Sequence, residues 1–241
     1  MTDQLLEAAQ AVGHAPRGLP EGGLKLLRPL GRRYIERRWK LRERGTHHVP
    51  EKGPVIIAAN HIGWMDGPLL IACTPRPAHA LVKSEAFEGR TGRLLRFVGQ
   101  VKIEREEPDV GALRAAADAL AAGQAVVVYP EGRRGEGELH EIKNGVAWLA
   151  LVTGAPVVPV AVFGTRAAGA DSESRPAPGA TLDLMYGSPI RFDAQPWPRP
   201  SSTVAEVGAQ IHHHLRDHLV WAQRVGQLSL PGPLPEGTTV V

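Results

Sequence analysis

The residues best suited to chemistry are a histidine and an aspartate five positions apart. The stretch Asn60-His61-Ile62-Gly63-Trp64-Met65-Asp66 directly follows the apolar run 55–59. Across a strand-to-helix turn, Asp66 can accept the proton of one imidazole nitrogen, fix the tautomer of His61 and stabilise the imidazolium. The other nitrogen can then take a proton from a hydroxyl group. The alternative is a polar loop whose histidine caps a helix, and the spacing alone leaves both open.

A second loop, suited to an anion, follows the apolar run 125–129. It reads Pro130-Glu131-Gly132-Arg133-Arg134-Gly135. The glycines expose backbone N–H groups, and two adjacent arginines supply forked donors for an oxyanion such as phosphate. The alternative is a solvated hairpin whose charges serve solubility. A third stretch, 99–105, brings Arg105 to the end of a short predicted strand, where by itself it is only an exposed charge.

The elements that position these loops alternate along the chain. Short β-branched runs predict strands at 55–59, 79–83, 101–104, 125–129, 157–162 and 181–186. Periodic Ala- and Leu-rich stretches predict helices at 67–72, 92–98, 108–122, from Gly145, and at 202–224. This alternation predicts one α/β domain with a mixed, mostly parallel central sheet flanked by helices, whose sites lie at strand ends. The uncharged run 145–164 has transmembrane length, but Gly154, Pro156 and Pro159 divide it into a buried helix, a turn and a strand.

Composition restricts the class of protein. The chain has 241 residues, of which 43% are hydrophobic, so it can bury a sizeable core. The single cysteine, Cys73, excludes an internal disulfide and a multi-cysteine zinc site and fits a reducing compartment. The first residues lack the pattern of a secretory signal, so we expect a cytosolic chain. The histidines at 212–214 and 218 are expected to lie on a solvated helix face, and no metal is predicted.

The positive charge is concentrated near the N-terminus. Residues 24–44 contain nine bases and two acids, a net +7, whereas the whole chain carries +3. Apolar residues three and four positions apart, with a tyrosine and a tryptophan among them, predict a basic amphipathic helix suited to an anionic membrane surface. Pro29 and Gly31 make two shorter helices as plausible as one. A helix packed on the domain by its apolar stripe is the alternative, and no motif supports nucleic-acid binding.

Three regions are expected on this basis. Residues 1–46 form the basic amphipathic N-terminal segment, residues 47–225 the α/β domain, and residues 226–241 a loose, proline-rich tail.

Taken in order, four blocks resemble the 1-acyl-sn-glycerol-3-phosphate acyltransferase family. They are Asn-His-x4-Asp at 60–66, Gly-x3-Ile-x-Arg at 99–105, Pro-Glu-Gly-x-Arg at 130–134 and Val-Pro-Val at 158–160. Each block is weak alone, but the ordered set is specific, although it spans less than half of the chain. Lys143-Asn144-Gly145 matches the Lys-x-Gly continuation of the third block. Arg133 stands where the family has threonine, which leaves the acceptor headgroup open.

The resemblance implies transfer of a fatty acyl group from acyl-CoA or acyl-carrier protein to a lipid hydroxyl, with lysophosphatidate as the leading acceptor and phosphatidate as product. It implies no cofactor, and the acyl thioester is a co-substrate. His61 would be the general base and Asp66 would orient it. The implied substrate-binding residues are Asn60, Arg105, Glu131, Gly132, Arg134 and Lys143. Val158 and Pro159 would line the binding site of the acyl chain, where a backbone N–H would bind the oxyanion.

The implied partners are a lysophospholipid and an anionic membrane, without nucleic acid, and the implied location is peripheral at the cytoplasmic face. Two alternatives stay open. The same chemistry could act on another lysophospholipid or a lipid alcohol, or the chain could be a non-catalytic lipid-binding protein of the same fold.

Overall fold

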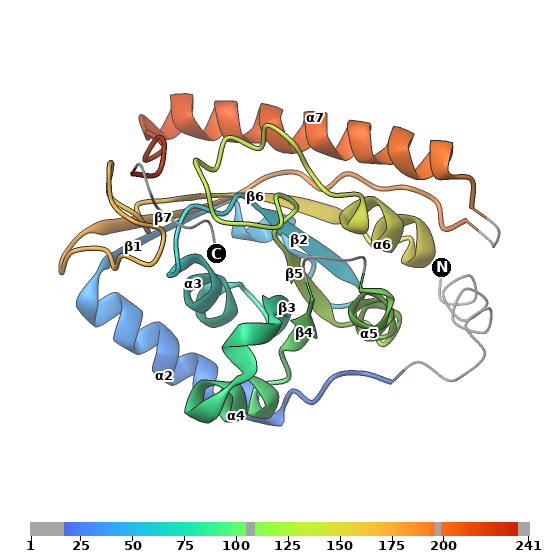
Figure 1. Ribbon diagram of the computed structural model, residues 1–241, viewed down its shortest axis with the longest axis horizontal. Coiled ribbons are helices and arrows are strands. Elements are labelled where there is room, and N and C mark those ends of the chain that lie inside the picture. Colours follow the sequence, from blue (N-terminus) through green and yellow to red (C-terminus); the bar gives the residue numbers. More distant parts are fainter. Residues whose placement is uncertain (1–16, 105–108, 196–198, 236–241) are drawn as a thin grey trace.

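Seven strands form one mixed sheet in the computed structural model, which describes residues 17–104, 109–195 and 199–235 (Figure 1). The strands are β1 (Lys40–Arg44), β2 (Val55–Ala59), β3 (Ala78–Lys83), β4 (Val101–Ile103), β5 (Ala125–Val128), β6 (Val157–Phe163) and β7 (Thr181–Tyr186). Their order is β1-β7-β6-β2-β5-β3-β4, and every neighbouring pair is parallel except β6 and β7. The predicted class and sheet type are confirmed.

Helices flank the sheet on both sides. They are α2 (Gly22–Arg38), α3 (Asp66–Cys73), α4 (Gly89–Phe97), α5 (Val110–Ala121), α6 (Gly145–Thr153) and α7 (Ser201–Gly226), with 3-10 turns η1 (Thr46–His48) and η2 (Ser84–Phe87). Helices α5, α6 and α7 cover one face of the sheet, and α2 and α3 cover the other (Figure 1). The side chains on each side form a separate core cluster with the strand residues of that face.

The central strand β2 shows why the sequence folds this way. All five of its residues are buried. Ile56 and Ala58 join the cluster of α5, α6 and α7, whereas Val55, Ile57 and Ala59 join the cluster of α2 and α3. Successive side chains of a strand point to opposite faces, so a strand covered on both faces must be apolar throughout. The loop that follows β2 therefore starts from a rigid position.

The uncharged run 145–164 folds as predicted. Helix α6 ends at Thr153, Gly154 adopts a left-handed conformation with φ of 65° as the C-terminal cap, and β6 follows. Glycine tolerates this backbone conformation without steric cost. None of the described helices combines the length and the apolar character that crossing a bilayer requires.

The N-terminal segment is helical as predicted up to residue 38 and differs from the prediction after it. One helix, α2, continues through Pro29 to Arg38, and residues 40–44 then form strand β1 instead of more helix. β1 pairs with β7, and Arg42 donates two hydrogen bonds to Asp183, of 2.8 and 2.9 Å. Four of its five residues are charged, which suits an edge strand, and such a short strand has little periodicity that separates it from a charged helix. The boundary at residue 46 stays a prediction, although β1 already belongs to the sheet.

The C-terminal tail was expected to be loose, and this is wrong for its first residues. Leu228 and Leu230 pack against the core cluster of α7, and Pro231 is buried. The carbonyl of Gly232 accepts a hydrogen bond of 2.7 Å from Arg166 Nη2. Prolines at 231, 233 and 235 suggested a free end, but the two leucines supply the apolar surface that brings the chain back to the domain.

Candidate active site

His61 and Asp66 meet at the carboxyl end of β2. Asp66 is the first residue of α3, and the loop between them folds back so that His61 Nδ1 lies 2.7 Å from Asp66 Oδ2. The same oxygen accepts the backbone N–H groups of Ile62 and Gly63 at 2.7 and 2.9 Å. Asp66 is fully buried, whereas the His61 side chain is 15% exposed. A carboxylate can only accept, so it places the proton on Nδ1 and leaves the Nε2 lone pair for a ligand.

Tyr129 covers one face of the imidazole. Its ring stacks on that of His61 with centroids 4.0 Å apart and an interplanar angle of 18°. Its hydroxyl is buried and has no hydrogen-bond partner among the described residues. Burial raises the pKa of the Tyr129 phenol well above its ordinary value, so the group stays neutral. The sequence indicates Tyr129 only as the last residue of the predicted strand 125–129. The parallel pairing of β2 with β5, which aligns Ala58 with Val128, brings it to His61.

The second oxygen of Asp66 is bonded from a distant part of the chain. The hydroxyl of Thr165, two residues after β6, donates to Asp66 Oδ1. The next residue, Arg166, donates from Nε to the carbonyl of Ile62 at 2.8 Å. Both residues are buried. Sequence reasoning missed them because no motif includes them and their partners lie about a hundred positions away.

Glu131 supports the His61 loop from the other side. Its Oε1 accepts the backbone N–H of His61 at 2.8 Å, and its carboxylate also bonds to the backbone of Leu139. Burial, reinforced by the negative charge of Asp66, raises the pKa of Glu131 from 4.5 to about 7. Its carboxylate thus connects two loops of the site, whereas the family resemblance implies that Glu131 binds substrate.

Asn60 is also placed differently from the expectation. It is buried, its Nδ2 donates to the carbonyl of Val162 at 3.1 Å, and its Oδ1 accepts the N–H of Val162 at 2.7 Å. These bonds join the end of β2 to β6. The amide therefore fixes the start of the loop and is not turned toward a ligand.

The predicted anion loop contacts Lys143 and carries Arg134. Gly132 has φ of 71°, and the side chain of Lys143 lies over it, so that a Cβ there would come within 2.6 Å of Lys143 Cε. Arg134 forms an ion pair with Glu173, and its charge favours a lower pKa of the Tyr129 phenol, whereas the charge of Asp66 favours a higher one. Arg134 and Asp66 thus both lie close enough to Tyr129 for their charges to act on its phenol.

Two further predictions concern residues at the sheet. Arg105 lies outside the described residues. Val158 and Pro159 are buried in the middle of β6, where Pro159 pairs with Ala58 and Val158 packs in the cluster of α2 and α3. A strand between β2 and β7 has both faces covered, so these side chains offer no surface to an acyl chain. The expected lining role is corrected to a core role.

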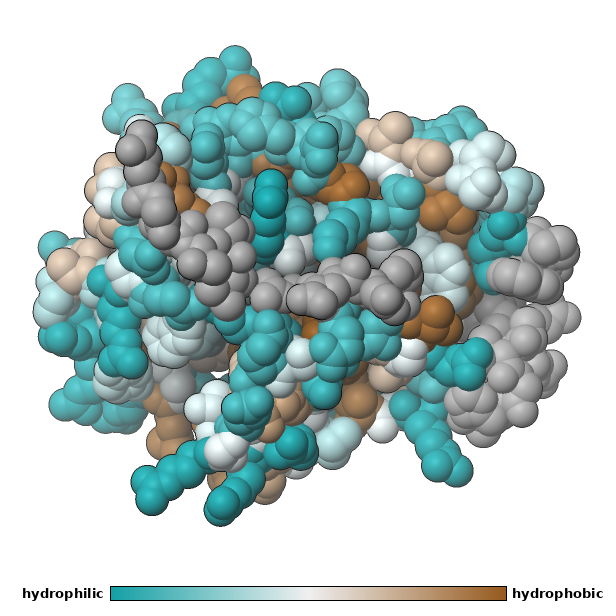
Figure 2. Space-filling view, viewed as in Figure 1, coloured by the Kyte–Doolittle hydropathy of each residue, from teal (hydrophilic) through white to brown (hydrophobic). Residues whose placement is uncertain are grey.

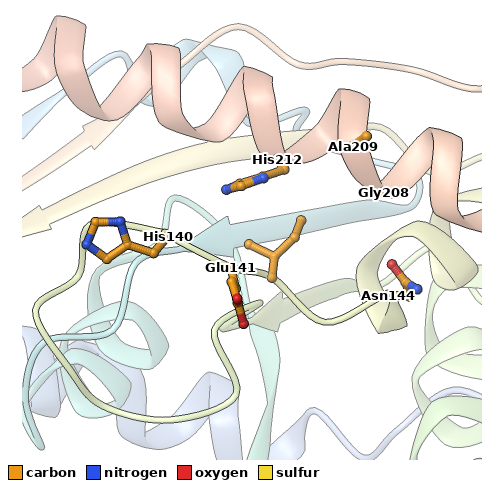
Figure 3. A pocket seen from close by; sticks show the side chains of 7 residues that line it. His140, Glu141, Asn144, Gly208, Ala209 and His212 are labelled. Carbon is orange, nitrogen blue, oxygen red and sulfur yellow. The ribbon is translucent and has the colours of Figure 1, made fainter.

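The histidines of α7 contact backbone carbonyls. Nε2 of His212, His214 and His218 lies 2.5, 2.8 and 2.8 Å from the carbonyls of Leu139, Ser188 and Met185. Beside His212, a cavity of about 290 Å³ lies between α7 and the loop that continues from the anion loop (Figure 3). Its lining residues are His140, Glu141, Ile142, Asn144, Gly208, Ala209 and His212. The cavity shares no residue with the His61–Asp66 pair.

The comparisons identify this α/β domain as an acyltransferase domain. The chain belongs to the acyltransferase family, whose model, described as Acyltransferase, matches residues 40–163. A 1-acyl-sn-glycerol-3-phosphate acyltransferase of Bacillus subtilis is 28% identical over 119 residues, which cover 48% of this chain and 59% of that protein. The protein of the same description from Cocos nucifera is 27% identical over 174 residues, covering 70% and 55%.

A solved structure is similar in fold. The 1-acyl-sn-glycerophosphate acyltransferase PlsC of Thermotoga maritima superimposes with a TM-score of 0.55, covering 80% of this chain and 79% of that one, at 24% identity. The chain spans somewhat more than half the length of the curated relatives named above. Thr165 and Arg166 lie just beyond the region that the family model matches.

Proposed function

We propose that the protein transfers a fatty acyl group from acyl-CoA or acyl-carrier protein to the free hydroxyl of lysophosphatidate and so forms phosphatidate. The observation that carries this proposal is the buried Asp66 carboxylate bonded to Nδ1 of a partly exposed His61. Membership of the acyltransferase family supports the reaction class, and the printed names of the relatives support the acceptor.

In the proposed reaction, His61 Nε2 removes the proton of the acceptor hydroxyl as its oxygen attacks the thioester carbonyl. Asp66 stabilises the imidazolium that forms, because its Oδ2 already holds the Nδ1–H. When the tetrahedral intermediate collapses, the C–S bond breaks, the ester remains, and the thiolate takes the proton from His61. The acceptor alcohol attacks directly, so the reaction needs no nucleophile from the protein. Cys73 fits this, since it is buried and burial raises the pKa of its thiol to about 12.

The acceptor phosphate would bind at the anion loop. Arg134 and Lys143 offer the positive charge that an oxyanion prefers, whereas the N–H of Gly132 already donates to the carbonyl of Tyr129 at 2.9 Å. Arg134 would have to exchange Glu173 for the phosphate, which is plausible energetically because Glu173 is about half exposed and such ion pairs contribute little. Arg105 joins this group only through its match to the family block.

A different acceptor is the alternative for the same chemistry. Arg133 is exposed at the position where the family has threonine, and a second charge there favours a headgroup with more negative charge or a wider one. A non-catalytic lipid-binding protein is the remaining alternative. The buried His61–Asp66 pair argues against it, because simple binding does not need an oriented base.

The apolar stripe of α2 has two parts that bear on membrane binding. Leu24, Ile35 and Trp39 are buried against the domain, so the packed-helix alternative is correct for them. Leu26 and Leu30 are instead 63% and 62% exposed and Tyr34 is 60% exposed, each four positions from the next. Their spacing places them on one side of the helix.

Exposed bases accompany this apolar side. Arg28, Arg32 and Arg42 form hydrogen bonds or ion pairs within the protein. These three of the nine basic residues therefore already have partners. Arg33 and Arg37 fall on the same side of α2 as Leu30 by their spacing, and both are exposed. Leu94 and Phe97 of the neighbouring α4 are also about half exposed. Around α2 and α4, long hydrophilic side chains project beside apolar ones (Figure 2).

We name the exposed set Leu26, Leu30, Tyr34, Leu94 and Phe97, with Arg33 and Arg37, the α2–α4 surface. We propose that it binds the protein peripherally to the anionic cytoplasmic leaflet, where the lysolipid acceptor is found. Apolar side chains would enter the headgroup region while the arginines pair with lipid phosphates.

A thiol-release assay tests the activity. Purified protein is incubated with acyl-CoA and, in turn, lysophosphatidate, other lysophospholipids and monoacylglycerol, and free CoA and lipid products are both measured. We expect release with lysophosphatidate together with phosphatidate, and a loss of about 10²- to 10⁴-fold in His61→Ala. Thiol release without an acylated lipid would indicate a thioesterase. Equal absence of release in wild type and His61→Ala across the panel would favour the lipid-binding alternative.

A further inference from the structure

Two consecutive residues outside the sequence motifs hold both ends of the His61–Asp66 loop. Thr165 and Arg166 follow β6. Gly164, between the strand and Thr165, has φ of 80°, and a Cβ at this position would clash with the carbonyl oxygen of Thr181. The Thr165 hydroxyl donates to Asp66 Oδ1, at the end of the loop, and Arg166 Nε donates to the carbonyl of Ile62, beside His61. Both side chains lie in the interior.

We propose that Thr165 is a positioning residue, which acts on the reaction by fixing the Asp66 carboxylate, and that Arg166 fixes the loop to which His61 belongs. This inference rests on the proposed acyl transfer. Asp66 Oδ2 already receives three donors, namely His61 Nδ1 and the N–H groups of Ile62 and Gly63. Oδ1 receives the Thr165 hydroxyl, which is its one hydrogen bond within the described part of the chain.

Thr165 controls the orientation of the carboxylate. With both oxygens bonded, the Asp66 plane cannot rotate, so Oδ2 stays directed at His61 Nδ1. Without the hydroxyl, Oδ1 would be a buried charged oxygen with no donor, since Asp66 is fully buried. Rotation to recover a partner would then take Oδ2 away from the imidazole.

Arg166 supports the same geometry through the backbone. Besides Ile62, it donates to the carbonyls of Gly135, Ala170 and Gly232, at 3.0, 2.9 and 2.7 Å. These carbonyls belong to the anion loop, the loop after β6 and the C-terminal tail, and the planar guanidinium can bond several of them at once. Gly63 permits the close approach, because a Cβ there would lie 3.3 Å from both Arg166 Cβ and the Thr165 carbonyl oxygen.

The test compares Thr165→Val, which keeps the shape and removes the hydroxyl, with Thr165→Ser, which keeps the hydroxyl. We expect kcat of Thr165→Val to fall about 10-fold with KM changed less than about 2-fold, since positioning acts on the transition state. Thr165→Ser should restore kcat to within about 3-fold of wild type. Thr153→Val is the matched control, because Thr153 is also buried, and its hydroxyl donates to the Leu149 carbonyl and accepts the N–H of Ala155, neither of which belongs to the site. It should lower the melting temperature without lowering kcat.

A double substitution decides whether Thr165 acts through Asp66. In an Asp66→Ala background, Thr165→Val should cause no further loss of kcat, because residues that act as a unit are not additive. An additive loss, or an equal loss in Thr153→Val, would overturn the proposal and leave Thr165 a residue of general stability.

Nitrogen NMR of histidine-labelled protein tests the inference without turnover. The Nδ1 resonance of His61, assigned with His61→Ala, should move in Thr165→Val and keep its wild-type position in Thr165→Ser and Thr153→Val. A shifted resonance in a protein that acylates none of the acceptors would refute the proposed function and retain the positioning role. An unchanged resonance in an active enzyme would refute the positioning role alone.

Discussion

Glu131 makes the stability of this protein depend on pH in a direction opposite to that of most acidic residues. Its pKa is raised from 4.5 to about 7 by burial and by the charge of Asp66. Between these values the folded state binds a proton that the unfolded state has lost, so stability decreases as pH rises through this window. Glu131→Gln keeps an oxygen that can accept the N–H of His61 and removes the charge.

The size of the effect follows from the same pKa. The interval from 4.5 to about 7 corresponds to about 3 kcal/mol at 1.36 kcal/mol for each pH unit. The side chain is partly exposed, and the charged form makes stronger hydrogen bonds to His61 and Leu139, so we expect about 1–3 kcal/mol. Glu131→Gln should therefore equal wild type near pH 5 and be more stable than wild type by this amount at pH 8.5.

Urea denaturation at pH 5, 6, 7 and 8.5 measures this difference in the free energy of unfolding. Glu51→Gln is the control at an exposed glutamate, and it should stay within about 0.5 kcal/mol of wild type at every pH. A difference between Glu131→Gln and wild type that is constant over pH, or that grows toward low pH, would refute this account of Glu131.

Three other substitutions test the site, the membrane surface and the tail. Glu173→Gln should free Arg134 and lower KM for lysophosphatidate about 2- to 5-fold without changing KM for acyl-CoA; an unchanged acceptor KM would mean that the ion pair does not compete with the phosphate. Leu30→Ser should weaken sedimentation with anionic vesicles about 10-fold, whereas Val220→Ser, at an exposed site on α7, should leave it unchanged; equal binding by both would argue against the α2–α4 surface. Leu230→Ala should lower the free energy of unfolding by about 1–2 kcal/mol, and a loss no larger than that of an exposed leucine would show that the tail does not stabilise the domain.

Much of the fold could be predicted because its signals are local. The buried strands 55–59 and 125–129 need only five or so consecutive apolar residues, and the helices need only their periodicity. Strand β1 was missed for the converse reason. Its charged residues adopt a strand conformation only by pairing with β7, which lies about 140 residues later in the sequence.

The site likewise has features that the sequence indicates and features that only the tertiary structure decides. The sequence indicated that His61 and Asp66 can meet, since five positions across a strand-to-helix turn allow the two side chains to fold back onto each other, and that an arginine-rich loop follows another buried strand. Only the tertiary structure decided that Tyr129 stacks on the imidazole, that Thr165 bonds the far oxygen of Asp66, and that Asn60 and Pro159 serve the interior. These contacts depend on the order and pairing of β2, β5 and β6, and the sequence order of strands does not state which of them become neighbours in a sheet.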